Sequence, residues 1–365
     1  MKKRIHGASR YYASDKNVFD ALNQHKVDTP TVMKLFQRRN VIVSNKTSRE
    51  DLAAYFARLT HDYYDHKDIA ARLGIVPRRE RITSMDVNGI DNIEVLQVAV
   101  EQLKKELEAA GDIVQISRKD DNFRINIQYS SVNYKLSEFA QVQVRDAEIE
   151  FAKSGDGSYV LRNTENKTIN GVRDSLLGNL EKSSTTLTKT VVSLFDIPSP
   201  KLRSKFFYDL SLKLDGYVRQ DVNAAYIFKA KPTESGEGVT GEEADTHIER
   251  VYLRGNGVAR SELLHQLLDD EDYYIIKIVW TVVESLGDGT VYEIEATFSE
   301  PKDCTDFSFI VNAVLPIEEG KVSKKRRRSP SLEETNVISK AIEAKSRELV
   351  KSLKDEYQNS LLKDS

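Results

Sequence analysis

The chain has little of what most small functional sites are built from. It holds one cysteine, Cys304, among 365 residues, which excludes an internal disulfide framework and a cysteine-rich zinc site. No apolar run approaches the roughly 20 residues that a membrane helix needs. The start, MKKRIHGASRYYASDKN, lacks the apolar centre of a signal peptide. These absences favour a cytoplasmic, bacterial protein with no membrane partner.

The common signatures of cofactor and catalytic sites are also missing. The sequence contains no Walker loop, no glycine-rich dinucleotide motif and no GxSxG serine elbow. His265 has no evident Ser or Cys partner, and Cys304 lacks the sequence signature of a nucleophile, so a structural role is expected for Cys304. We therefore expect no cofactor, and the sequence names no reaction.

Charge is distributed unevenly along the chain, although the net charge is only −3. Residues 1–60 contain 12 Lys or Arg and 5 Asp or Glu, whereas residues 231–320 contain 6 and 20. Residues 321–365 are basic again, with 12 against 7. This pattern predicts either polyanion binding by the two ends or docking of both ends on the acidic region.

Hydrophobic periodicity predicts an α+β protein with a helical N-terminal module, antiparallel hairpins and a long C-terminal helix. Helices are expected at 17–26, 31–39, 49–64, 66–74, 90–110, 169–182, 198–214, 261–268 and 332–362. Strands or hairpins are expected at 112–132, 140–164, 216–230, 248–255, 272–298 and 306–317, with hairpin turns at 119–122, 154–157 and 287–289. The expected domains are a basic helical module (1–75), an α+β domain (76–230), an acidic linker or loop (231–247), a sheet-rich domain (248–320), a basic connector (321–331) and the final helix (332–365).

One basic stretch, RRNVIVSNKTSRED (38–51), joins two of the expected helices. Ser48 is placed as the N-cap of the second helix, with Asp51 three residues on in the manner of a capping box. The flanking helices carry an apolar pair, Leu35 and Phe36, and a charged-charged-Leu start at Arg49, Asp51 and Leu52. With the apolar extension Val41 to Val43, residues 28–60 resemble the SAP and helix-extension-helix modules.

The resemblance covers about 35 residues and has departures. Asn40 stands where that family usually has glycine, and asparagine is the next-best residue for a left-handed backbone. NKTS is a longer insertion than usual, and the glycine before the second helix is absent. The resemblance implies binding of DNA or RNA, with phosphate contacts from Arg38, Arg39, Lys46 and Arg49. Such contacts supply affinity without sequence information and make binding salt-dependent. The alternative is an ordinary helix pair with a solvated basic face.

A second basic run, SKKRRRSP (323–330), holds five consecutive cations: Lys324, Lys325, Arg326, Arg327 and Arg328. Because no aromatic residue interrupts it, it offers no platform on which bases could stack. The run is expected to be a solvated linker that contacts polyanions opportunistically.

Three groups of acidic residues were considered as metal or nuclease sites. In HDYYDHKD (61–68), two His and three Asp share helical spacing, but no further ligand motif accompanies them. Asp156 with Glu165 and Lys167 has the spacing of a metal-dependent nuclease, but the triplet falls in a polar turn. Glu293 and Glu295 share a sheet face without an evident Lys or His partner. We expect no metal site.

These features together favour a non-enzymatic protein that binds nucleic acid, DNA in preference to RNA, or another polyanion. It would act within a larger bacterial assembly, and the composition of the chain suggests antiviral defence by analogy. The apolar stripe of the 332–362 helix predicts a protein partner or self-association as an oligomer. The alternatives are an interaction scaffold without a nucleic-acid role and a metal-dependent nuclease whose carboxylates are dispersed in the sequence.

Overall fold

The structure, a computed structural model, describes residues 13–24, 27–62, 64–66, 68–69, 79–90, 92–135, 139, 141–183, 186–229, 249–270, 272–286, 289–318, 321–322 and 326–362. The chain divides into two units that are interleaved in sequence. Unit 1 comprises residues 1–79, 92–150 and 175–183, and unit 2 comprises residues 80–91, 151–174 and 184–365.

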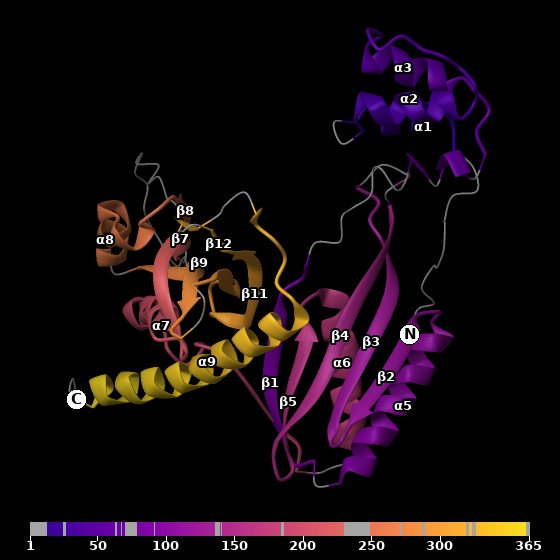
Figure 1. Cartoon of the computed structure of the whole chain (residues 1–365). Coiled ribbons are helices and arrows are strands. Elements are labelled where there is room, and N and C mark those ends of the chain that lie inside the picture. Colours follow the sequence, from indigo (N-terminus) through magenta and orange to yellow (C-terminus); the bar gives the residue numbers. More distant parts are fainter. Residues whose placement is uncertain are drawn as a thin grey trace, which may run out of the picture. The chain divides into compact units, whose positions relative to one another are not determined.

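The first part of unit 1 is a bundle of three short helices, which we call the head (Figure 1). These are α1 (Asp15–Leu22), α2 (Thr29–Gln37) and α3 (Arg49–Ala57). Ser14, Asp28 and Ser48 cap their N-termini with side-chain oxygens that accept backbone N–H bonds. The apolar faces of the three helices meet in a core of their own, centred on Phe36 and Phe56.

The rest of unit 1 combines a helix with antiparallel strands. Helix α5 (Ile93–Ala109) precedes β2 (Ile113–Lys119) and β3 (Asn122–Val132), which pair as a tight hairpin. Strand β4 (Val142–Gly155) follows β3 in the sheet and passes from unit 1 into unit 2 at Phe151. Helix α6 (Lys167–Ser183) begins in unit 2 and passes into unit 1 at Ser175.

Unit 2 contains most of the sheet, in the order β5-β1-β11-β10-β9-β7-β8, with β6 added beside β1. Its strands pair antiparallel along β1–β5, β1–β11, β10–β11, β9–β10, β7–β9 and β7–β8. Their bounds are β1 (Ile82–Asn88), β5 (Ser158–Thr164), β6 (Thr188–Val191), β7 (Tyr217–Lys229), β8 (Arg250–Arg254), β9 (Tyr273–Glu284), β10 (Val291–Glu300) and β11 (Thr305–Leu315). A small hairpin, β12 (Ile317–Glu318) with β13 (Lys321–Val322), follows.

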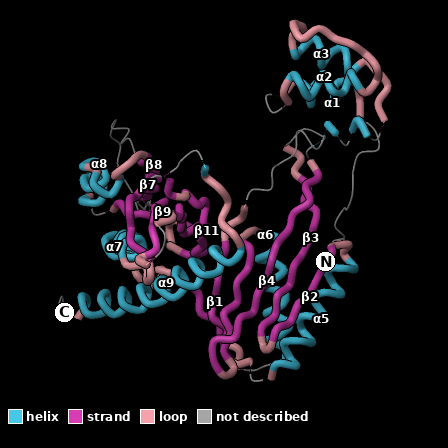
Figure 2. The backbone as a smooth tube through the Cα atoms, viewed as in Figure 1, coloured by secondary structure: helices cyan, strands magenta, loops and turns pink. Residues whose placement is uncertain are grey.

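Helices α7 (Pro200–Leu212) and α9 (Leu332–Leu361) pack with this sheet, and α9 runs as one long helix in Figure 2. The short elements η2 (Val258–Arg260) and α8 (Glu262–Asp269) follow β8. The core contains Trp280, the phenylalanines of α7 and the apolar stripe of α9. Ile338, Ile342, Leu349 and Leu353 are all buried in this core. These four positions of the stripe are covered within the chain, whereas Leu361 near the end of α9 is exposed, and self-association through α9 stays a prediction.

The α+β class is confirmed, and the hairpins expected at 112–132 and 140–164 form with turns at 120–121 and 156–157. Strands β9 and β10 also pair, while residues 287–288 of the third expected turn lie outside the described residues. Two assignments need correction. The helix expected at 49–64 ends at Ala57, and the helix expected at 66–74 lies largely outside the described residues. No strand is expected from the sequence between 74 and 90, yet β1 pairs with β5, β6 and β11. Its sequence, ITSMDVN, lacks the apolar pattern by which a buried strand is recognised. The strand is nevertheless accommodated in the sheet, because its polar side chains find partners on neighbouring elements.

Among the helices in the described ranges, none combines the length and apolarity that crossing a membrane requires.

Candidate nucleic-acid interface

The connection from α2 to α3 begins with a defined helix stop. Asn40 adopts the left-handed conformation at φ +56°. The Asn40 N–H donates to the Gln37 carbonyl at 3.0 Å, and the Val41 N–H donates to the Phe36 carbonyl at 3.0 Å. This pair of bonds is a Schellman motif, and Val41 packs on the head core beside it. Asn can occupy the position because it tolerates the left-handed region better than most other residues.

The two helices run parallel to each other. At their starts, the Arg49 guanidinium of α3 donates to the backbone carbonyls of Gln24 and Val27, just before α2, at 3.2 and 3.4 Å. At their ends, the rings of Phe36 and Phe56 lie 5.2 Å apart. The connection from the end of α2 to the start of α3 must therefore span the length of a nine-residue helix, about 13 Å. Residues 41–44 form neither helix nor strand, as the expected loop requires.

The Ser48 cap forms as expected, with its hydroxyl accepting the Asp51 N–H at 3.1 Å. The reciprocal half of a capping box takes another form, because the Asp51 carboxylate accepts from the Ser48 hydroxyl at 2.6 Å. An aspartate is one methylene shorter than the glutamate of the usual motif and bonds to the nearer group.

The four residues expected to contact phosphates, Arg38, Arg39, Lys46 and Arg49, have different surroundings. Arg39 pairs with Asp65 and lies 5.0 Å from the centre of the Phe56 ring, while Arg49 is held by backbone carbonyls. Arg38 pairs with Asp68 but keeps 59% of its side chain exposed, and Lys46 is exposed. Arg39 and Arg49 thus help to build the head, whereas Arg38 and Lys46 lie at its surface.

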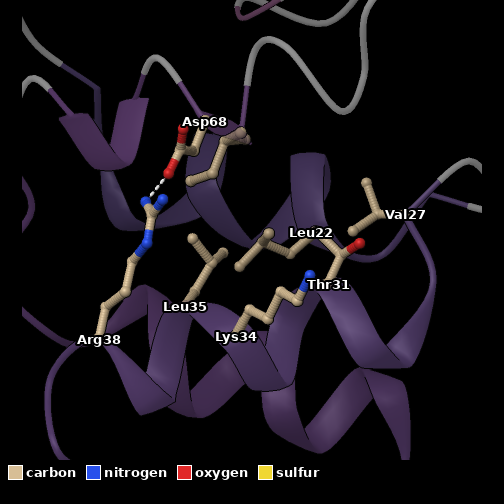
Figure 3. A pocket seen from close by; sticks show the side chains of 8 residues that line it. Leu22, Val27, Thr31, Lys34, Leu35, Arg38 and Asp68 are labelled. Atoms are coloured by element: carbon tan, nitrogen blue, oxygen red, sulfur yellow. Dashed lines mark ion pairs between the residues drawn. The ribbon is translucent and has the colours of Figure 1, made fainter.

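A small hollow opens beside Arg38 (Figure 3). Its volume is about 90 Å³, and Leu22, Val27 and Leu35 form its apolar part. Lys34, Arg38 and Asp68 also line it, and the Arg38–Asp68 ion pair is drawn there as a dashed line.

The connection itself projects from the head. The Ile42 side chain is 97% exposed, between the two half-buried valines Val41 and Val43 that anchor the loop to the core. Tyr55 on α3 is also exposed and stacks on Phe36 at 5.4 Å. An exposed isoleucine between two cationic positions has no packing role within the described head.

His61 is a titratable group packed inside the head. Its ring is buried against Phe56 at 5.0 Å, and its Nδ1 lies 3.4 Å from the Arg39 guanidinium. Burial lowers its pKa below the ordinary 6.5, and Arg39 and His66 add to the shift, while the Ala57 carbonyl and Asp65 oppose it. Between this lowered pKa and 6.5, His61 is therefore mostly neutral in the folded head and mostly protonated in the unfolded chain.

We accordingly expect the head to be fully stable above pH 6.5 and to lose stability as the pH falls through the lowered pKa of His61. Hydrogen exchange of the α3 amides at pH 7.5 and 5.5, corrected for intrinsic rates, measures this loss. His61→Gln should remove most of the difference. An equal pH dependence in His61→Gln would assign the effect to other groups.

The second basic run is held by its own chain where the structure describes it. Arg327 pairs with Glu293 at 2.7 Å, and Arg328 pairs with Glu334 at 2.6 Å. The backbone of Arg328 also exchanges two hydrogen bonds with Val314 of β11. Arg326 is described, whereas Lys324 and Lys325 lie outside the described residues. Arg327 and Arg328 are therefore paired within the chain, although about half of each side chain is exposed, and contact of this run with polyanions stays a prediction.

The acidic groups considered as metal sites do not converge. Asp156 and Glu165 lie at opposite ends of β5, which separates them by about 23 Å at 3.3 Å per residue. In the 61–68 segment, Asp65 is occupied by Arg39. Within the described residues, no three His, Cys, Asp or Glu side chains are placed to share an ion. Burial raises the pKa of Cys304 to about 12, which leaves its thiol protonated and unreactive at neutral pH.

Glu293 and Glu295 do have cationic partners, which corrects the sequence analysis. Glu293 pairs with Arg327. Glu295 pairs with Lys277 at 2.8 Å and with Arg81 at 2.9 Å. Burial alone raises the pKa of Glu295, but Lys277 and Arg81 outweigh it and leave the pKa below its usual value of 4.5. These partners are distant in sequence, so no local motif could have revealed them.

Comparison with known proteins adds little. No family model and no curated protein matches the chain. Among solved structures, one similar chain is the di-domain ARO/CYC StfQ from the steffimycin biosynthetic pathway, with 10% identity over 76% of this chain and 99% of that one. The TM-score is 0.16.

Proposed function

We propose that the protein binds nucleic acid through the head, DNA in preference to RNA, as a non-enzymatic component of a larger bacterial assembly in the cytoplasm. The observation that carries this proposal is the connection between the parallel helices α2 and α3. Arg38 lies at its beginning and Lys46 near its end, with the exposed Ile42 between them. The preference for DNA follows the resemblance to helix-extension-helix modules.

The surroundings of each cation narrow the proposed contact surface. Arg38 and Lys46 would contact phosphates, since their side chains are exposed. Arg39 and Arg49 would support the surface from within, because their guanidinium groups have partners inside the head. Phosphate contacts of this kind position the protein without reading the sequence, so we expect weak base specificity.

Binding of the full chain to a fluorescent duplex at several salt concentrations tests the proposal. Arg38→Gln with Lys46→Gln removes two phosphate contacts, so the slope of log K against log salt should fall by about 2. Lys104→Gln with Lys213→Gln makes the same charge change on two lysines with helical ion pairs elsewhere and should leave the slope unchanged. No binding at low salt, or an equal slope in the first double variant, would refute the proposal.

A second candidate, an interaction scaffold without a nucleic-acid role, is favoured by the basic connector. Arg327 docks on Glu293 of the acidic region, and Arg328 on Glu334 at the start of α9. Arg328 lowers the pKa of Glu334 to about 2, so this contact persists across the physiological range. In this reading the C-terminal cations hold α9 to the sheet. We therefore leave both arginines out of the proposed nucleic-acid surface.

A further inference from the structure

Unit 2 carries a row of side chains that crosses four strands of its sheet. Tyr252 of β8 lies directly opposite Tyr226 of β7, and Tyr226 lies opposite Lys277 of β9. The two tyrosine rings stack with centroids 4.2 Å apart and an interplanar angle of 27°. The Lys277 ammonium is 4.8 Å from the centre of the Tyr226 ring and pairs with Glu295 of β10 at 2.8 Å.

This row is rigid because each member is held by the next. Arg81 and Lys277 both pair with the half-buried Glu295, which fixes the lysine over the tyrosine ring. A cation over an aromatic face and a second ring stacked beside it both stabilise the arrangement. Tyr252 is thus positioned before any ligand arrives, and a ligand that stacks on it does not pay the cost of ordering it.

Strand β8 presents an alternating basic and aromatic surface at the end of the strand order. Arg250, Tyr252 and Arg254 are exposed, whereas Val251 and Leu253 between them pack on the core. Tyr252 keeps 47% of its surface exposed. Residues two apart on a strand are separated by about 7 Å, so one arginine lies on each side of the ring at that spacing.

The partners of the two arginines differ. Arg250 contacts its neighbour Glu249 at 3.4 Å but remains 67% exposed. Arg254 forms no ion pair with any residue in the described ranges and is exposed. Glu295, the acidic member of the row, is occupied by Lys277 and Arg81. The exposed end of the row is therefore aromatic and cationic, although unit 2 as a whole contains an acidic region.

We propose that Tyr252, with Arg254 and Arg250 beside it, is a binding site for single-stranded nucleic acid. A base would extend the stack of Tyr226 and Tyr252, and the arginines would contact the phosphates on either side of it. Stacking of this kind accepts any base, because every base has a π-face. A duplex would bind poorly here, because its bases are already stacked inside the helix. The site does not depend on the head.

The test is binding of the full chain to a fluorescently labelled 15-nucleotide oligo(dT). Loss of one base–aromatic stack corresponds to about 5- to 150-fold in affinity, so Tyr252→Ala should weaken binding by at least fivefold. Tyr252→Phe keeps the ring and should bind within about twofold of the unmodified chain. Tyr134→Ala removes an exposed tyrosine of unit 1 and should have no effect. Arg254→Gln should lower the salt slope by about 0.7.

A duplex of the same length separates this site from the head. Tyr252→Ala should leave duplex binding unchanged, and the Arg38→Gln, Lys46→Gln double variant should reduce it. Ultraviolet crosslinking of an oligonucleotide with 5-iododeoxyuridine should label the peptide that contains Tyr252. The inference is overturned if the chain does not bind oligo(dT), or if Tyr252→Ala binds it as tightly as the unmodified chain. Neither outcome affects the duplex result, on which the head proposal depends.

Discussion

Replacing Glu343 with glutamine is expected to destabilise unit 2 by about 3–5 kcal/mol. Glu343 of α9 accepts two hydrogen bonds from the Arg162 guanidinium of β5, at 2.6 and 2.7 Å. The Glu343 side chain is 2% exposed and that of Arg162 is 13% exposed. The variant leaves the buried Arg162 guanidinium without its counter-charge. The cost of removing this charge from water is then no longer offset by an ion pair. Trp280, which is buried in the same unit, reports unfolding in urea by fluorescence.

The matched control is Glu356→Gln on the same helix. Glu356 pairs with Lys205 at 2.6 Å, but both side chains are more than 40% exposed, so the change should cost less than 1 kcal/mol. Replacing both Arg162 and Glu343 with methionine should recover much of the loss, because a buried ion pair and an apolar pair of similar volume are close in stability. Equal destabilisation by Glu343→Gln and Glu356→Gln would show that burial of the pair is not the cause.

Replacing Phe36 with alanine is expected to cost the head about 3–5 kcal/mol. Phe36 is fully buried and contacts both Tyr55 and Phe56, so its loss leaves a cavity where α2 and α3 end. The bundle has its own small core and little stability to spare. Hydrogen exchange should show loss of protection across α1, α2 and α3, while α9 and β9 keep theirs.

Ile42→Ala is the control for this change. Ile42 is as large an aliphatic residue as the head contains but is 97% exposed, so its truncation should leave protection within about 0.5 kcal/mol. If the head proposal is correct, Phe36→Ala should also lose duplex binding, since the connection is held by the core that it disrupts. Protection that fell equally in β9 would mean that the head and unit 2 unfold together.

Local patterns predicted a large part of the fold. The alternation in 272–298 and the short turns at 119–122 and 154–157 identified hairpins, because strand periodicity and turn chemistry are properties of neighbouring residues. The same holds for the Ser48 cap and for the stop at Asn40, whose left-handed backbone was anticipated from residue type. Strand β1 was missed because its polar residues find their hydrogen-bond and ion-pair partners on elements far away in the sequence.

The candidate sites divide in the same way. The sequence by itself identified the basic connection between two helices, because its charge and its flanking periodicity are local features. Only the tertiary structure distinguished the exposed Arg38 and Lys46 from Arg39 and Arg49, which hold the head together. The alignment of Tyr252, Tyr226 and Lys277 depends on strand register, which is set by pairing between residues up to 51 positions apart. The physical reason is that periodicity and caps act over one turn or one strand, whereas ion pairs and stacked rings depend on where the folded chain brings distant residues together.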